Sequence, residues 1–157
     1  MHNQTLIVVL VDSDTNRIMA DYGENAGKGT QYIWLSMSCE DFFPPLDQRN
    51  NREKVAVFTY INLHYVDLNE TDSVRVTHEL NNNSDFRLST GELKFTKLAR
   101  TGDIACITRI GERDYQLRLI SQESSQFEYL SRFATTSVGY KGKRIGYIPN
   151  ENLYQIL

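Results

Sequence analysis

The chain has 157 residues, of which 40% are hydrophobic and 24% charged, and this composition predicts one soluble globular domain with a sizeable core. Its net charge of −3 at pH 7 counts against indiscriminate nucleic-acid binding, which needs a basic surface over the phosphate backbone. The charge is uneven, however. Residues 132–148 carry four basic residues and no acid, whereas residues 12–34 carry two basic residues against four acids.

The cysteines and the first apolar run favour a cytoplasmic protein without a membrane span. Cys39 and Cys106 belong to no Cys-x-x-Cys or Cys/His spacing, so we expect two reduced thiols rather than a zinc site or a disulfide. The run Leu6–Val11 has six residues and no basic segment before it, so it predicts a buried strand and not a signal sequence. Because this strand starts almost at Met1, we expect the chain to be a domain cut from a larger protein.

Short β-like runs recur along the chain, and turn residues separate them. Their apolar patterns predict strands at residues 6–11, 31–35, 55–60, 63–68, 74–77, 86–88, 93–98, 104–110, 115–120 and 144–148. Between two of these runs, Gly111-Glu112 is a hairpin signal. Many short strands with few helices predict a barrel or a sandwich, with its function on loops or on an outer face.

Three short helices are expected among these strands. Ser38 and Asp41 resemble a capping box that opens one helical turn before Pro44-Pro45. A second short amphipathic helix is predicted by Phe127, Leu130 and Phe133, which recur at helical spacing. At the end of the chain, Asn150-Glu151 is expected to cap a terminal helix.

Two long polar segments interrupt the β pattern. The first follows Asp12 and re-enters the core at Gly27-Lys28-Gly29-Thr30, where glycine permits a close approach to a partner. The second runs from Asn81 to Thr90 between basic flanks. Ordinary explanations exist for both, namely a mobile surface loop and a simple turn. Both segments nevertheless carry side chains that can read base edges in the DNA major groove: Arg17, Gln31, Asn82, Asp85 and Arg87.

Two further features concern possible DNA contacts by residues that do not read base edges. Trp34, the single tryptophan, has two possible roles: a core aromatic, or an outward ring that packs on sugar or phosphate. In the acid-free basic segment, Gly142 lets the loop approach closely, so Lys143 and Arg144 are expected to contact the phosphate backbone.

No catalytic arrangement is found in the sequence. None of His2, His64 and His78 stands two residues before a lysine or forms a His-x-x-x-His pair, and His64 and His78 are most simply strand histidines. No Asp…Glu-x-Lys arrangement suited to metal-dependent phosphodiester hydrolysis is present. We therefore expect no catalytic residue, no metal, no cofactor and no nuclease activity in this chain. An enzyme with an unfamiliar site stays open as an alternative, ranked behind the two binding functions given below.

Several motifs, in the same order and over nearly the whole chain, closely resemble the B3-like DNA-recognition domain of the BfiI type of restriction endonuclease. They are Gly27–Leu35, Asp41–Leu46, Asn82–Leu88 with Gly91, Asp103–Arg109 and Gly142–Ile148. More distantly, the Gly-rich loop and the Phe-Pro helix resemble the effector domain of EcoRII. The resemblance implies a mainly β fold, a seven-stranded pseudobarrel with short helices over residues 1–157. In such domains two arms grip the major groove of double-stranded DNA like a wrench.

Carried over by position, the resemblance implies DNA contacts on both arms. The first arm would be Ser13–Trp34, with Arg17, Thr30 and Trp34, and the second Arg75–Lys94, with Arg75, Asn82, Asp85 and Arg87. Arg52 and Lys143 would come from neighbouring loops. Residues 18–25 do not match the family securely, so the preferred bases are not predicted.

The resemblance also implies a role in a larger enzyme. Such domains are usually fused behind a metal-independent, phospholipase-like nuclease, which is not in this chain. We therefore expect the recognition domain of a type IIS-like endonuclease with an asymmetric target site. The main alternative is a small β-barrel that uses the same loops for a protein or sugar ligand, and the acidic pI of 5.6 favours it mildly.

Overall fold

The computed structural model describes residues 3–15, 32–50, 55–80, 85–90, 98–139 and 142–157. The strands in these ranges are β1 (Gln4–Val9), β2 (Tyr32–Leu35), β3 (Gln48–Asn50), β4 (Ala56–Tyr65), β5 (Glu70–Glu79), β6 (Asp85–Ser89), β7 (Ile104–Arg109), β8 (Asp114–Ile120), β9 (Thr136–Ser137) and β10 (Arg144–Pro149). The helices are α1 (Asp12–Thr15), the 3₁₀ helix η2 (Met37–Phe42), α2 (Phe127–Ser131) and α3 (Asn150–Ile156). None of the described helices has the length and apolar character that crossing a membrane would require.

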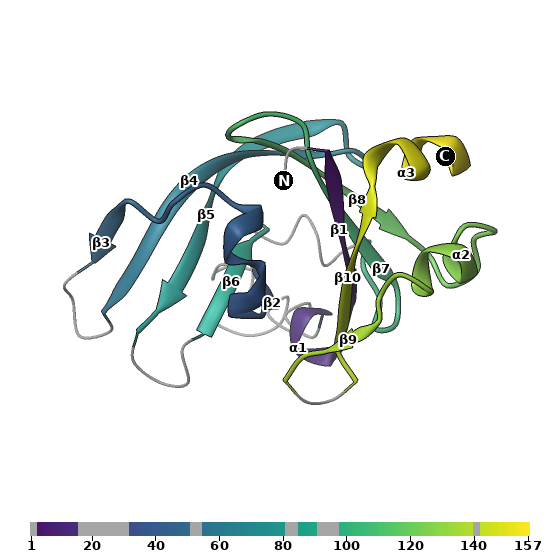
Figure 1. The fold of residues 1–157 in the computed structure, drawn as a ribbon, viewed down its shortest axis with the longest axis horizontal. Helices are drawn as coiled ribbons and strands as arrows, with labels where there is room; N and C mark the ends of the chain where they lie inside the picture. The colour runs from purple at the N-terminus through teal and green to yellow at the C-terminus, as the bar shows by residue number, and fades with distance from the viewer. Residues whose placement is uncertain (1–2, 16–31, 51–54, 81–84, 91–97, 140–141) are drawn as a thin grey trace, which may run out of the picture.

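The strands form one strongly curled sheet, which appears as a half-barrel in Figure 1. The order is β2-β6-β5-β4-β8-β7-β1-β10-β9, with β3 beside β4. Neighbours are antiparallel except β4 and β8, which are parallel. The expected mainly β fold is confirmed. The described residues hold ten strands rather than seven, and two of them, β3 and β9, have only three and two residues.

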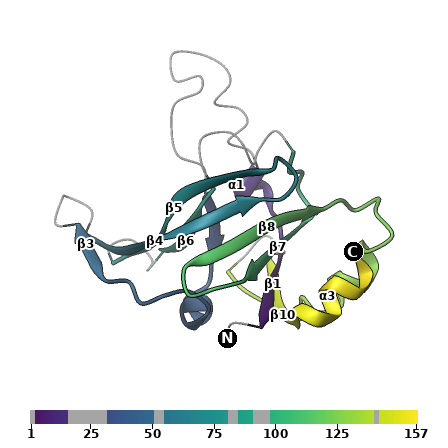
Figure 2. The same ribbon diagram turned by 90° about the horizontal axis from the view of Figure 1, so that it is seen from above.

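Strand β1 lies between two hydrophobic cores, and this explains its continuous apolar run. Leu6, Val8 and Leu10 face the larger core, on the side of the sheet where η2 supplies Phe42. On the other face of the sheet, Ile7 and Val9 pack with residues of α2 and α3. Figures 1 and 2 show α3 beside the strands β1 and β10. Helices α2 and α3 therefore cover this second face of the sheet at the strands β1, β7, β8 and β10.

The expected break between two strands at residues 61–62 is wrong, because β4 runs unbroken for ten residues. Buried Ile61, Leu63 and Tyr65 alternate with exposed or half-buried neighbours, so the period of two continues through the expected break. The real turn follows Tyr65. It ends at Asn69, whose φ of 51° lies in the left-handed region that asparagine tolerates better than most residues. The expected strand at 93–98 falls almost wholly outside the described residues.

Two helix starts differ from the expected caps. At η2 the cap is Ser36, whose Oγ accepts a hydrogen bond from the Ser38 backbone N–H at 3.2 Å. At α3, Pro149 occupies the cap position and makes no side-chain cap bond. The side chain of Asn150 instead accepts from Thr5 Oγ1 at 2.8 Å and donates to the Arg109 carbonyl at 3.3 Å. Asn150 thus ties the start of α3 to β1 and β7.

Alkaline pH should destabilise the fold because it removes protons from buried cysteine thiols and tyrosine hydroxyls. Burial raises the pKa of Cys106 to about 12 and raises the pKa of Cys39, Tyr65, Tyr115 and Tyr147. Their ordinary values are 9.0 and 10.0, so the unfolded chain loses these protons first. Their contribution is complete below pH 9 and is lost as the pH rises towards the folded values. We expect the free energy of unfolding, measured in urea, to fall between pH 9 and pH 11. A constant value over this range would contradict the prediction.

Candidate nucleic-acid interface

Strands β2, β4, β5 and β6 present two different faces. Residues such as Ile33, Phe86 and Leu88 face the larger core, as the alternation of strand side chains requires. The intervening residues lie on the opposite face, where the strand register places Trp34 beside Arg87, Arg87 beside Thr77, and Thr77 beside Phe58. This opposite face carries charged and aromatic side chains. We call it the polar face.

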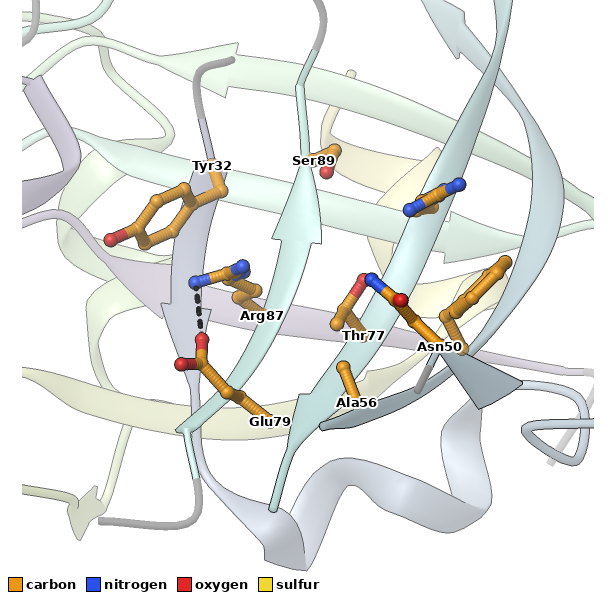
Figure 3. Close-up of a pocket in the computed structure, with 9 residues that line it drawn as sticks. Tyr32, Asn50, Ala56, Thr77, Glu79, Arg87 and Ser89 are labelled. Atoms are coloured by element: carbon orange, nitrogen blue, oxygen red, sulfur yellow. Dashed lines mark ion pairs between the residues drawn. The ribbon is translucent and has the colours of Figure 1, made fainter. Parts of the chain in front are cut away.

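A hollow of about 400 Å³ lies on the polar face (Figure 3). Its lining combines aromatic rings, two arginines, an acid and small polar groups, contributed by Tyr32, Asn50, Ala56, Phe58, Arg75, Thr77, Glu79, Arg87 and Ser89. Such a mixture offers hydrogen-bond donors, acceptors and flat apolar surfaces within one concave site.

Arg87 lies at the centre of an ion-pair cluster on this face. Its Nη1 lies 3.2 Å from Glu79 Oε2 and 3.3 Å from Asp85 Oδ2. The guanidinium carbon is 4.7 Å from the centre of the Tyr32 ring, which is cation–π distance. Figure 3 shows Arg87 between Tyr32 and Glu79. The side chain of Arg87 remains 28% exposed, so a ligand in the hollow can reach it.

Arg75 is held by aromatic rings instead. Its guanidinium carbon is 4.0 Å from the centre of the Phe58 ring and 5.4 Å from that of Tyr60. Its Nε also donates to the Tyr60 hydroxyl at 3.1 Å. Stacking and a directed hydrogen bond fix the plane of the guanidinium, and Arg75 is exposed.

Several predicted contact residues belong to segments that join the polar face. Tyr32 directly follows residues 16–31, Asn50 directly precedes residues 51–54, and residues 81–84 lie between β5 and β6. The predicted residues Arg17, Thr30, Gln31, Arg52 and Asn82 lie outside the described residues. Of the predicted residues that are described, Trp34, Arg75, Asp85 and Arg87 lie on or beside the polar face.

A buried ion pair joins the two ends of the predicted first arm. Lys143 Nζ lies 2.8 Å from Asp14 Oδ1, and each side chain is only 1% exposed. Lys143 also donates to the Trp34 carbonyl, while Asp14 accepts from the Trp34 backbone N–H at 3.2 Å. Asp14 precedes residues 16–31 and Trp34 follows them. The Asp14–Lys143 pair therefore holds the two ends of this segment together and joins them to the start of β10.

The buried position of Lys143 corrects the expectation that this residue contacts DNA phosphate. Burial lowers the pKa of Lys143, and Asp14 opposes that shift. An ammonium that is paired and shielded from water cannot also meet the DNA backbone. Arg144 is exposed, so the expected phosphate contact stays with Arg144.

The half-buried Trp34 has a structural contact of its own. Its ring lies against Gly139, where an added Cβ would come within 2.7 Å of Trp34 Cη2. Gly139 also has a φ of +62°, so both space and backbone conformation require glycine there. Trp34 thus packs on the loop before β10, and its partly buried ring also contacts the larger core.

Sequence reasoning missed three residues of this region: Asp14, Phe58 and Glu79. A signal existed for Glu79, since Glu79 and Asp85 are acids at equal distance from Asn82 in the Asn-rich sequence, where a hairpin would pair them. For Asp14 no local signal existed, because its partner is 129 residues away.

The geometry agrees with the comparisons with known proteins. A family model described as the DNA-binding domain of the metal-independent restriction enzyme BfiI matches residues 1–157. The chain belongs to this family. This chain is also similar in fold to the N-terminal domain of Helicobacter pylori LlaJI.R1. The TM-score is 0.53, with 17% identity over 92% of this chain and 97% of that chain.

A second solved structure is less similar to this chain. It is the B3 domain of the UbaLAI restriction endonuclease with cognate DNA, with a TM-score of 0.45 and 12% identity over 92% of this chain and 87% of that chain. No curated protein sequence matches the chain. Family membership assigns DNA binding to this chain, and the likeness to the LlaJI.R1 domain concerns the fold alone.

Proposed function

We propose that this domain binds double-stranded DNA sequence-specifically and reads the major groove with two arms, residues 13–34 and 75–94. The observation that carries the proposal is the polar face, where Arg75 and Arg87 are held by aromatic rings and acids on the strands that lead into both arms. An arginine whose plane is fixed is suited to a bidentate contact with a guanine edge.

The two arms differ in sequence, and a single curled sheet has no two-fold axis. The target site should therefore be asymmetric, unlike the palindromes that symmetric dimers read. In the proposed parent protein, a nuclease domain joined to this chain cuts the DNA, and this domain selects the site as in a type IIS-like restriction endonuclease.

Selection from a random duplex library tests the proposal. The purified domain is mixed with the library at low salt, bound DNA is recovered over several rounds, and the enriched sequences are aligned. We expect a short, non-palindromic consensus. If no consensus appears, sequence-specific readout is wrong, and the hollow is then better tested with protein and sugar ligands.

Arg144→Ala should weaken binding to specific and random duplexes by a similar factor, because a phosphate contact carries no sequence information. The slope of log Kobs against log salt should become shallower by about 0.9 for one lost phosphate contact. Titrations at several salt concentrations measure this slope. Arg132→Ala is the matched control, since Arg132 pairs with Glu128 on α2. An unchanged slope in the Arg144 variant would remove this residue from the interface.

A further inference from the structure

The ion-pair cluster of Arg87, Glu79 and Asp85 has a geometry unsuited to binding phosphate. Glu79 and Asp85 lie directly opposite each other in the register of β5 and β6, and both pair with the same nitrogen of Arg87. Two carboxylates and one guanidinium sum to −1, so this part of the polar face repels a phosphate. The same groups place a cationic donor beside an anionic acceptor. That combination suits a partner with both acceptors and a donor.

A G·C base pair presents this combination in the major groove. Guanine offers the acceptors O6 and N7, and cytosine offers the N4 amino group as a donor. Arginine is the commonest reader of guanine, and aspartate or glutamate can accept from cytosine N4. Both partners of one base pair would thus be read by side chains that already contact each other in the protein.

The exposure of the two acids separates their roles. The side chain of Glu79 is only 8% exposed, whereas that of Asp85 is 22% exposed. A buried acid can hold Arg87 but is poorly placed to reach a base, and Asp85 is better placed to do so. We infer that Arg87 and Asp85 together read one G·C pair of the target site, with Glu79 as a positioning residue for Arg87. This inference rests on the proposed function.

The test replaces each guanine of the selected consensus, one at a time, with 7-deazaguanine, which lacks the N7 acceptor. Wild-type binding should fall roughly 5- to 150-fold at one G·C position. Arg87→Ala should lose affinity for the unmodified site, and should show no further loss with 7-deazaguanine at that position. Sensitivity at the other guanines should stay as in the wild type.

Two acid variants test the division of roles. Asp85→Asn should reduce discrimination between G·C and the other pairs at that same position. Glu79→Gln should make the loss with 7-deazaguanine there smaller, because Arg87 is held less firmly. Asp72→Asn, which removes an acid from the other end of β5, is the matched charge control and should leave this discrimination unchanged. Thermal denaturation establishes that each variant is folded, and Asp85→Asn keeps the test available if Arg87→Ala does not fold.

The outcomes separate this inference from the function beneath it. A selection without any consensus would overturn both. A clear consensus in which 7-deazaguanine weakens the wild type and Arg87→Ala equally at every position, or in which Asp85→Asn keeps full discrimination, would overturn only the assignment of the G·C pair.

Discussion

Replacement of Lys143 with methionine should lower the free energy of unfolding by about 3–5 kcal/mol, because it leaves Asp14 as a buried charge without its cation. For a domain of this size the melting temperature should fall by roughly 6–20 °C. Urea denaturation and calorimetry measure both quantities. The same variant should also weaken DNA binding at temperatures where it is folded, since the two ends of the proposed first arm lose the ion pair that joins them.

Two controls separate the ion pair from general damage. The double variant Asp14→Asn with Lys143→Met removes both charges, and it should recover part of the lost stability. The neighbouring variant Arg144→Met alters an exposed side chain and should change stability by less than about 0.5 kcal/mol. If Lys143→Met and Arg144→Met were equally stable, the buried pair would have no structural role.

The two proposed arms should read different parts of the target site. Arg17→Ala should cost roughly 1–3 kcal/mol of binding free energy and relax the base preference at one end. Asn82→Ala or Arg87→Ala should do the same at the other end, because more than sixty residues of chain separate the two groups. Binding-site selection with each variant shows which base pair loses its preference.

The asymmetry of the site is tested in the same selections. The wild-type consensus should have no two-fold symmetry, and Arg144→Ala should lose affinity without relaxing any base pair. If Arg17→Ala and Asn82→Ala relaxed the same base pair, or if the wild-type consensus were a palindrome, the division between two arms would be wrong.

Much of the fold was predictable because its strands carry regular apolar patterns. The continuous run at Leu6–Val11 indicated a strand buried on both faces, and Gly111-Glu112 indicated the turn between β7 and β8. The division of β4 between residues 60 and 63 was wrong, because Ile61 and Asn62 continue an unbroken alternation of buried and exposed positions. Local pattern gives the strand, but only pairing with β5 defines its length.

The candidate site was less predictable because its charges are paired across the fold. Four basic residues in 132–148 suggested one basic surface, yet Lys143 is neutralised by Asp14 and Arg132 pairs with Glu128. A sum along the chain cannot show such partners. Arg87 and Asp85 were predicted from the chemistry of base readout, whereas Glu79 was missed although its spacing from Asp85 indicated that the two would pair between β5 and β6.

The division of β2, β4, β5 and β6 between a core face and a polar face bears on how new specificities arise. Ile33 and Leu88 maintain the fold, while Arg87, one residue before Leu88, lies on the polar face. Substitutions on the polar face should therefore leave the packing of the core face unchanged. We expect that a lineage can exchange residues of the polar face at alternate positions without repacking its interior, so homologues with different targets should diverge at every second residue of these strands.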